Sequence, residues 1–166
     1  IIQETNFPPN TFAQSLKAKT TNLIGVIIPR LDSFATMKTL IGIDKTLQEN
    51  NYQMLVANAN QTTGTEIQAI ENFIKQKVAG IILLTKTLTN EHQKIMANSN
   101  IPILFVGQEY KDQYCLVHDD YDAAYELGAY VLSQGHRHIA YLGIEKDDIS
   151  VGINRKNGFQ KAIENL

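Results

Sequence analysis

Short runs of apolar residues recur along the chain after about residue 21 and are separated by longer segments of mixed character. The runs are rich in β-branched and aliphatic residues and are nearly continuous, which is typical of parallel strands covered on both faces. They occupy residues 23–28, 52–57, 79–84, 101–106, 115–118 and 139–142. We therefore predict a strand in each of these segments.

The intervening segments place apolar residues at the three- and four-residue spacing of amphipathic helices. This spacing is seen in residues 37–47, 67–74 and 124–131. Asp119 and Asp120 precede the last helix, predicted at 121–134, where carboxylates suit the positive end of the helix dipole, and Gly135 ends it. Alternating strands and helices predict an α/β fold, with doubly wound parallel sheets and right-handed crossovers.

The loops at the carboxyl ends of the predicted strands are the candidate ligand-binding regions. In open parallel sheets, ligands bind just outside these ends. The loops begin at Pro29, Asn58, Thr85, Gly107 and Gly143. The hydrophobic periodicity therefore predicts a binding site at these loops, but it does not identify the ligand.

The composition favours a folded domain and indicates the type of cellular compartment in which it functions. Of the 166 residues, 43% are hydrophobic and 19% are charged, which is enough apolar content for a packed core and excludes a disordered chain. No apolar run reaches the roughly 18 residues of a membrane helix. The single cysteine, Cys115, has no internal disulfide partner, and no secretory signal is visible. We expect a reducing compartment, the cytoplasm, and no membrane association.

Charge is distributed unevenly along the chain. Residues 1–20 hold two lysines and one glutamate, whereas the whole chain has a formal net charge of −2. The remainder is therefore mildly acidic and is a poor surface for nucleic acid. Any contact with DNA is expected from the first twenty residues or from a segment outside this sequence.

The opening segment does not fit a strand–helix unit. Pro8 and Pro9 are followed by Asn10, a favourable N-cap, and residues 11–17 have the length of about two helical turns. An isolated helix this short is marginal in water. The segment is either a frayed terminal arm or a helix that forms only against a partner.

This opening segment resembles the linker of the lactose-repressor (LacI) family. Residues 4–16, Glu-Thr-Asn-Phe-Pro-Pro-Asn-Thr-Phe-Ala-Gln-Ser-Leu, are similar to the family pattern of an aromatic residue followed by Pro-Asn-x-x-Ala-x-x-Leu. The resemblance implies a hinge helix that folds when two subunits bind operator DNA together. In the family, the leucine wedges into the minor groove, and the cost of unstacking is repaid by a bent, wider groove. The implied DNA-binding residues are Asn10, Ala13, Leu16 and Lys19.

Similarity to the same family continues over essentially the whole chain. Residues 134–143 match its Gly-His-x-x-Ile segment and residues 155–159 its Arg-x-x-Gly-aromatic motif; the segments 21–29, 77–83 and 101–106 resemble its first, third and fourth strands. The resemblance implies a periplasmic-binding-protein-like core of two lobes with an effector between them. It assigns 1–20 to the end of a helix-turn-helix headpiece and the hinge helix, 21–117 to the N-terminal lobe and 118–166 to the start of the C-terminal lobe.

Arg155 is the leading candidate for effector binding, because in the family the matching arginine reaches hydroxyls of the effector. A guanidinium offers several fixed donors, suited to vicinal hydroxyls or to a phosphate. The loop Arg30-Leu31-Asp32-Ser33 resembles the trehalose-repressor subgroup, in which the loop arginine binds a sugar 6-phosphate. That subgroup has a second arginine where this chain has Gly107-Gln108. A disaccharide phosphate and a neutral disaccharide such as sucrose therefore both stay open.

Further effector contacts are implied at Thr85, Gly107 and His118, which follow the predicted third and fourth strands and begin the second lobe. Residues 148–152 resemble the subgroup's Asp-x-Thr-Thr-Gly segment and add Ser150. His118 either stacks on a pyranose face or is a histidine hydrogen-bonded at the lobe boundary.

Motifs for catalysis, metal binding or a cofactor are not evident. No phosphate-binding glycine loop follows the first predicted strand, and the adjacent Asp119 and Asp120 are expected to diverge rather than pair. His136 and His138 have a metal-like spacing but no carboxylate or cysteine partner nearby. We expect neither an enzyme nor a metal or cofactor site.

Together these features predict a cytoplasmic, sugar-responsive repressor that binds operator DNA as a homodimer. The alternative, from another class, is an extracytoplasmic sugar-binding protein of a transporter, which shares the core fold. Such a protein would carry an export signal ahead of the first strand and no Pro-Asn-x-x-Ala-x-x-Leu element.

Overall fold

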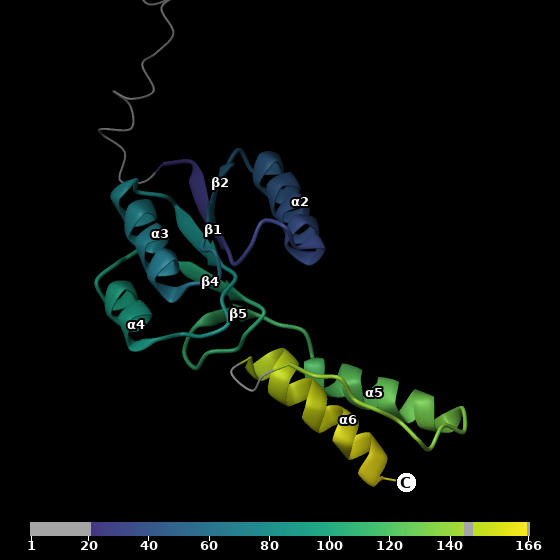
Figure 1. Cartoon of the computed structure of the whole chain (residues 1–166). Helices are drawn as coiled ribbons and strands as arrows, with labels where there is room; N and C mark the ends of the chain where they lie inside the picture. The colour runs from purple at the N-terminus through teal and green to yellow at the C-terminus, as the bar shows by residue number, and fades with distance from the viewer. Residues whose placement is uncertain (1–20, 145–147, 166) are drawn as a thin grey trace, which may run out of the picture. The chain divides into compact units, whose positions relative to one another are not determined.

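The computed structural model describes residues 21–144 and 148–165 and has an α/β fold (Figure 1). Its strands are β1 (Leu23–Ile28), β2 (Gln53–Asn58), β3 (Gly80–Leu83), β4 (Ile103–Val106) and β5 (Tyr114–Leu116). Its helices are α2 (Phe34–Glu49), α3 (Thr63–Lys75), α4 (Asn90–Ala97), α5 (Asp120–Ser133), the π-helix η1 (Ile149–Asn154) and α6 (Arg155–Glu164).

The strands form a sheet in the order β2-β1-β3-β4-β5. β1 pairs with β2 in parallel, with Leu23 opposite Gln53, and β4 pairs with β5 in parallel, with Leu104 opposite Tyr114. These pairings confirm the predicted parallel arrangement. By its contacts the chain divides into two compact units, one within residues 1–82 and 94–103 and the other within 83–93 and 104–166. The predicted lobe boundary at residue 117 stays a prediction.

β1 lies at the centre of the first unit, where Val26, Ile27 and Ile28 are fully buried. Helices α2 and α3 lie on either side of the pair formed by β1 and β2 (Figure 1). α3 comes very close at Gly25, where an added Cβ would lie 2.3 Å from the ring of Phe73. A glycine at this strand position therefore lets a large aromatic ring pack closely against the sheet.

Three of the described α-helices begin at a polar side chain that caps a free backbone amide. Ser33 accepts a hydrogen bond from the amide of Thr36, Thr62 from that of Thr65, and Asp119 from that of Asp122. The predicted start of α5 is therefore confirmed to within a residue. α3 begins at Thr63, four residues before the helical spacing seen at 67–74.

The prediction that all the strands are covered on both faces was wrong for β2 and β5, in which residues such as Val56 and Tyr114 are exposed. Both strands are at the edges of the sheet order, where the helices give less cover. The predicted strand at 139–142 was also wrong, and Leu142 is 99% exposed. No ladder partner for it lies in the part of the chain that the structure describes, and a strand without a partner leaves its backbone polar groups unpaired.

No helix among the described residues is long and apolar enough to cross a bilayer.

Candidate functional site

The candidate site lies in the second unit and is built on the close packing of α5 against α6 (Figure 1). Two glycines allow the contact. An added Cβ at Gly128 would lie 2.8 Å from the Cβ of Ala162, and one at Gly158 would lie 2.1 Å from the carbonyl oxygen of Tyr121. The glycine of the Arg-x-x-Gly-aromatic motif therefore brings the first turn of α6 against the first turn of α5.

This packing places Arg155, the first residue of α6, beside Asp120, the first residue of α5. The Nε of Arg155 donates to Oδ1 of Asp120 at 2.5 Å. The Asp120 side chain is 7% exposed, whereas that of Arg155 is 47% exposed. No terminal amino group of Arg155 bonds within the described ranges 21–144 and 148–165. A ligand can therefore reach donors that the ion pair holds in place.

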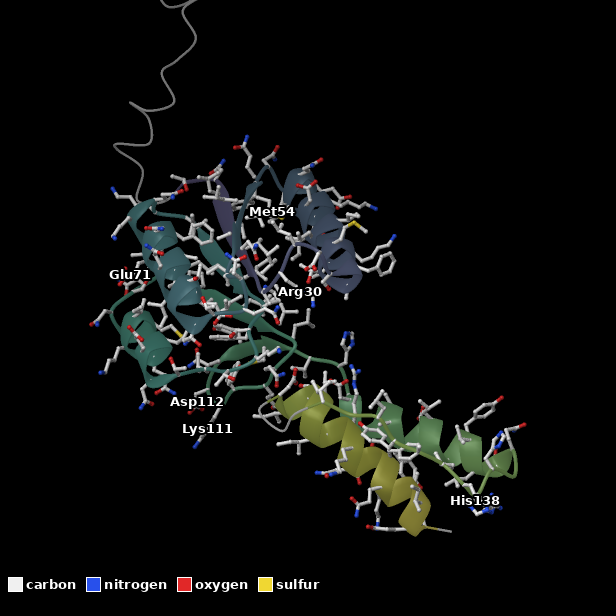
Figure 2. The ribbon with its side chains drawn as sticks, in the orientation of Figure 1. Arg30, Met54, Glu71, Lys111, Asp112 and His138 are labelled. Atoms are coloured by element: carbon white, nitrogen blue, oxygen red, sulfur yellow. The ribbon has the colours of Figure 1, made fainter. Side chains whose placement is uncertain are left out.

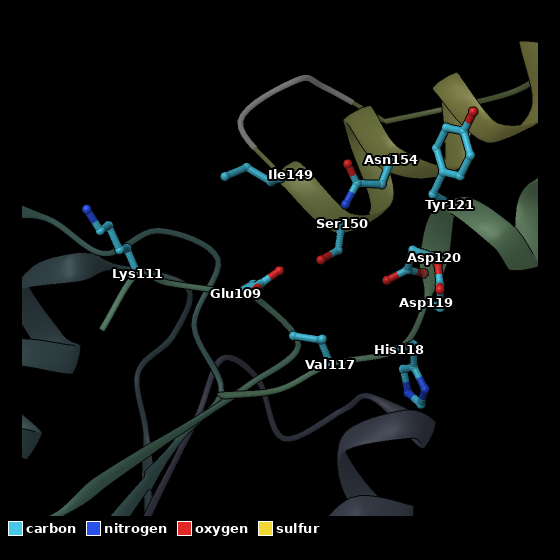
Figure 3. Close-up of a pocket in the computed structure, with 10 residues that line it drawn as sticks. All are labelled: Glu109, Lys111, Val117, His118, Asp119, Asp120, Tyr121, Ile149, Ser150 and Asn154. Carbon is cyan, nitrogen blue, oxygen red and sulfur yellow. The ribbon is translucent and has the colours of Figure 1, made fainter. Parts of the chain in front are cut away.

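A cavity of about 710 Å³ opens in front of Asp120 (Figure 3). Three segments line it: Glu109 and Lys111 lie after β4, His118 and Asp119 before α5, and Ser150 with its neighbours in η1. The full lining comprises Glu109, Lys111, Val117, His118, Asp119, Asp120, Tyr121, Ile149, Ser150 and Asn154. An adjoining, more apolar cavity of about 750 Å³ shares His118 and Asp120 and is also lined by Arg155.

One wall of the polar cavity is held by a buried hydrogen-bond cluster around Gln108. Its Nε2 donates to Oδ1 of Asp148 at 2.7 Å, and its Oε1 accepts from the backbone amide of Ser150 at 3.3 Å. The hydroxyl oxygen of Ser150 lies 2.8 Å from the carbonyl oxygen of Gly107. Asp148 also caps η1 by accepting from the amide of Val151. The cluster joins the end of β4 to the start of η1.

We expect Gln108→Ala to lower the free energy of unfolding by about 2 kcal/mol, because it leaves buried groups of Asp148 and Ser150 without their partner. Urea denaturation of the two proteins measures this difference. The matched control is Gln113→Ala, which removes an exposed glutamine from the β4–β5 segment. Equal stability of the two variants would contradict a structural role for the cluster.

The predicted effector residues of the second unit do not all face the cavity. His118 and Ser150 line it, whereas Arg155 pairs with Asp120 and lines the adjoining, more apolar cavity. Gly107 has a φ of +98° and contributes its carbonyl oxygen to Ser150. Thr85 is buried, with its hydroxyl 3.4 Å from the backbone of Thr87. The effector roles of these residues stay predictions.

In the first unit, Arg30, which is labelled in Figure 2, and Asp32 of the loop after β1 form an exposed, two-pronged ion pair. Nε and Nη2 of Arg30 donate to the two carboxylate oxygens at 2.6 and 2.7 Å. The hydrogen bond from Arg30 holds the pKa of Asp32 below its usual value, and the carboxylate raises the pKa of Arg30. Ser33 caps α2.

The DNA-binding residues implied by the resemblance, Asn10, Ala13, Leu16 and Lys19, lie outside the residues that the structure describes.

Asp120, Gln108 and Asp148 are parts of the site that sequence reasoning missed. Asp119 and Asp120 do diverge as predicted, since one caps α5 and the other pairs with Arg155. Asp120 and Arg155 are 35 positions apart in the chain, so no local sequence pattern indicates that they pair. Within the described residues, no group of three or more histidine, cysteine or acidic side chains is arranged to hold a metal ion.

Comparison with known proteins identifies the family to which the chain belongs. The model of periplasmic binding proteins and the sugar binding domain of the LacI family matches residues 21–166. The sucrose operon repressor of Staphylococcus xylosus is 39% identical over 164 residues, which cover 99% of this chain and 51% of that protein. The chain spans about half the length of the curated relatives it matches.

Solved structures agree with this assignment. Transcription regulator CcpA of Lactococcus lactis has 26% identity and a TM-score of 0.77, covering 88% of this chain and 54% of that one. The lac repressor dimer bound to operator and the anti-inducer ONPF has 22% identity and a TM-score of 0.83, covering 99% and 50%, and so bears on the fold alone. The predicted family resemblance and α/β fold class are confirmed, and these relatives are named as regulators rather than as enzymes.

Proposed function

Because the chain belongs to the family of periplasmic binding proteins and LacI-type sugar-binding domains, we propose that it is the sensor part of a sugar-responsive repressor of a carbohydrate-utilisation operon. The observation that carries the proposal is Arg155, which is paired with Asp120 and lines the cavity that adjoins the polar one. The 39% identity to a sucrose operon repressor supports the regulatory role over a transporter's binding protein. A repressor acts on DNA, and we therefore place the protein in the cytoplasm.

The proposed effector is a disaccharide or a disaccharide phosphate. Arg155 donates hydrogen bonds to its hydroxyls, the exposed imidazole of His118 stacks on a pyranose face, and Ser150 lines the opposite wall. Pyranose rings present both apolar faces and hydroxyl edges, and the lining offers partners for each. Arg30, Asp32, Ser33, Thr85 and Gly107 are proposed as further effector contacts through their match to family positions.

Switching follows from linkage between the effector and operator DNA. An effector that binds one orientation of the two lobes more tightly than another shifts the protein toward that orientation. We propose that the effector-bound orientation keeps the two hinge helices of a dimer from pairing on DNA. The two ligands then weaken each other's binding by the same factor.

An apolar stripe on α2 supports a homodimer. Phe34, Met37 and Ile41 are spaced along one side of the helix and are 71%, 46% and 57% exposed. Exposed apolar stripes of this kind are typical of surfaces that a partner covers. We propose that α2 contributes to the contact between two copies of the chain.

The test of the proposed function uses the full-length protein and operator DNA from its own operon. We expect Leu16→Ala to weaken operator binding by at least about tenfold and to reduce DNA bending, because the minor-groove wedge is lost. Sugar affinity is expected to be unchanged. Gel mobility and fluorescence measurements of bent DNA give the first two quantities, and calorimetry gives the third.

Gln14→Ala is the matched control, since it changes a position that the hinge pattern leaves open. If Leu16→Ala bends DNA as much as the wild type does, the proposed role of Leu16 as a minor-groove wedge is contradicted. Operator binding that no sugar alters would contradict the proposed function as a whole.

A further inference from the structure

We infer that Asp120 makes the proposed effector site selective for an uncharged sugar over the corresponding sugar phosphate. The inference rests on the proposed function, which leaves both effector classes open. It assigns the choice between them to one side chain that none of the family motifs quoted above contains.

The argument begins with the charge on Arg155. Its Nε is bonded to a carboxylate whose side chain is 7% exposed, so the guanidinium and the carboxylate form a neutral pair. Both residues line the more apolar of the two cavities, and Asp120 lines the polar one as well. The pair is kept in register by the backbone contact of Gly158 with Tyr121, directly after Asp120. At the N-terminus of α5, the negative charge of Asp120 also lies at the favourable end of the helix dipole.

A neutral guanidinium–carboxylate pair suits hydroxyl groups. The terminal amino groups of Arg155 donate to hydroxyl oxygens, and Oδ2 of Asp120 accepts from a hydroxyl hydrogen. A sugar hydroxyl can both donate and accept, so one diol satisfies both partners. A phosphate dianion only accepts, and it would lie against the Asp120 carboxylate without a hydrogen to share.

The rest of the described lining does not supply the missing positive charge. Glu109 and Asp119 face the cavity with Asp120, and Lys111 is the cation among the ten lining residues. Carboxylates close to a bound phosphate repel it, and this cost is large where water is displaced. The loop arginine that resembles the phosphate-binding one, Arg30, is itself bonded through two nitrogens to Asp32.

The experiment measures affinities of the full-length protein for two ligand pairs, sucrose with sucrose 6-phosphate and trehalose with trehalose 6-phosphate. Titration calorimetry is carried out at constant ionic strength without DNA. In the wild type we expect the preferred free sugar to bind at least about tenfold more tightly than its phosphate. A wild-type preference for either phosphate would overturn the inference.

Asp120→Asn tests the residue itself. The amide keeps a hydrogen-bonding group beside Arg155 but leaves its charge uncompensated, so the ratio of phosphate to free-sugar affinity is expected to rise about tenfold. Glu126→Gln, which removes one exposed carboxylate from the same helix, controls for net charge and should leave the ratio unchanged. Asp120→Glu should retain the wild-type ratio.

An unchanged ratio in Asp120→Asn would overturn the inference. If that variant does not fold, the wild-type ratio and the Asp120→Glu ratio still decide it. If the wild type does not bind operator DNA, the proposed function is contradicted, but the ratio of phosphate to free-sugar affinity can still be measured. A wild-type affinity ratio that favours the phosphate would overturn the inference about Asp120 but would leave the proposed function intact.

Discussion

Replacement of Arg155 by alanine is expected to lower affinity for the sugar effector by at least about 100-fold, while operator binding persists. Two hydrogen bonds from a charged donor to sugar hydroxyls are together worth about 3 kcal/mol, which corresponds to this factor. The variant also leaves the nearly buried carboxylate of Asp120 without its cation, which disfavours a compact, ligand-bound site. Calorimetric titration of the full-length protein measures the affinity, and operator release by sugar measures the response.

The neighbouring Lys156 provides the matched control for this prediction. It is an exposed cation one residue further along α6, and it lines neither of the two cavities beside Asp120. Lys156→Ala should bind sugar and release operator like the wild type. Wild-type sugar affinity in Arg155→Ala would rule out the proposed effector role of this arginine.

Gly158→Ala is expected to lower the free energy of unfolding by about 3 kcal/mol and to weaken effector binding. The added methyl would lie 2.1 Å from the carbonyl oxygen of Tyr121, and backbone cannot swing aside as a long side chain can. α6 must shift away from α5, and this shift separates Arg155 from Asp120. Urea denaturation followed by circular dichroism measures the change.

Gly64→Ala is the matched control, since it adds the same methyl to the first turn of α3, where no atom lies within 4 Å. That variant should match or slightly exceed the stability of the wild type, because alanine favours the helix more than glycine does. If Gly158→Ala were as stable as Gly64→Ala, the close contact of α5 with α6 would not position Arg155.

The pattern of apolar residues predicts most of the fold because each element leaves a local mark. β1 lies at 23–28 as predicted, and β2, β3 and β4 overlap the predicted runs within two residues at each end. Ser99 and Pro102 explain why β4 begins later than predicted. The backbone N–H of Ile101 donates a hydrogen bond to the hydroxyl of Ser99, and Pro102 has no backbone N–H to donate to a neighbouring strand. η1 and α4 have no comparable mark and were not predicted.

The sequence indicated Arg155, His118 and Ser150 as site residues through their motifs, whereas Asp120 and Gln108 emerged only from the structure. A motif records residues close together in the chain. The Arg155–Asp120 and Gln108–Asp148 contacts join residues separated by 35 and 40 positions. Which carboxylate meets which donor depends on how the helices pack, and no local pattern specifies that.

By itself the sequence determined the alternation of strands and helices, the parallel sheet and the resemblance of essentially the whole chain to the LacI family, because hydrophobic periodicity and short motifs are local properties. Tertiary structure alone decided that 139–142 is not a strand, that Gly158 lets α6 approach α5, and that Arg155 is paired with Asp120. These outcomes depend on partners distant in the chain, which only folding brings together.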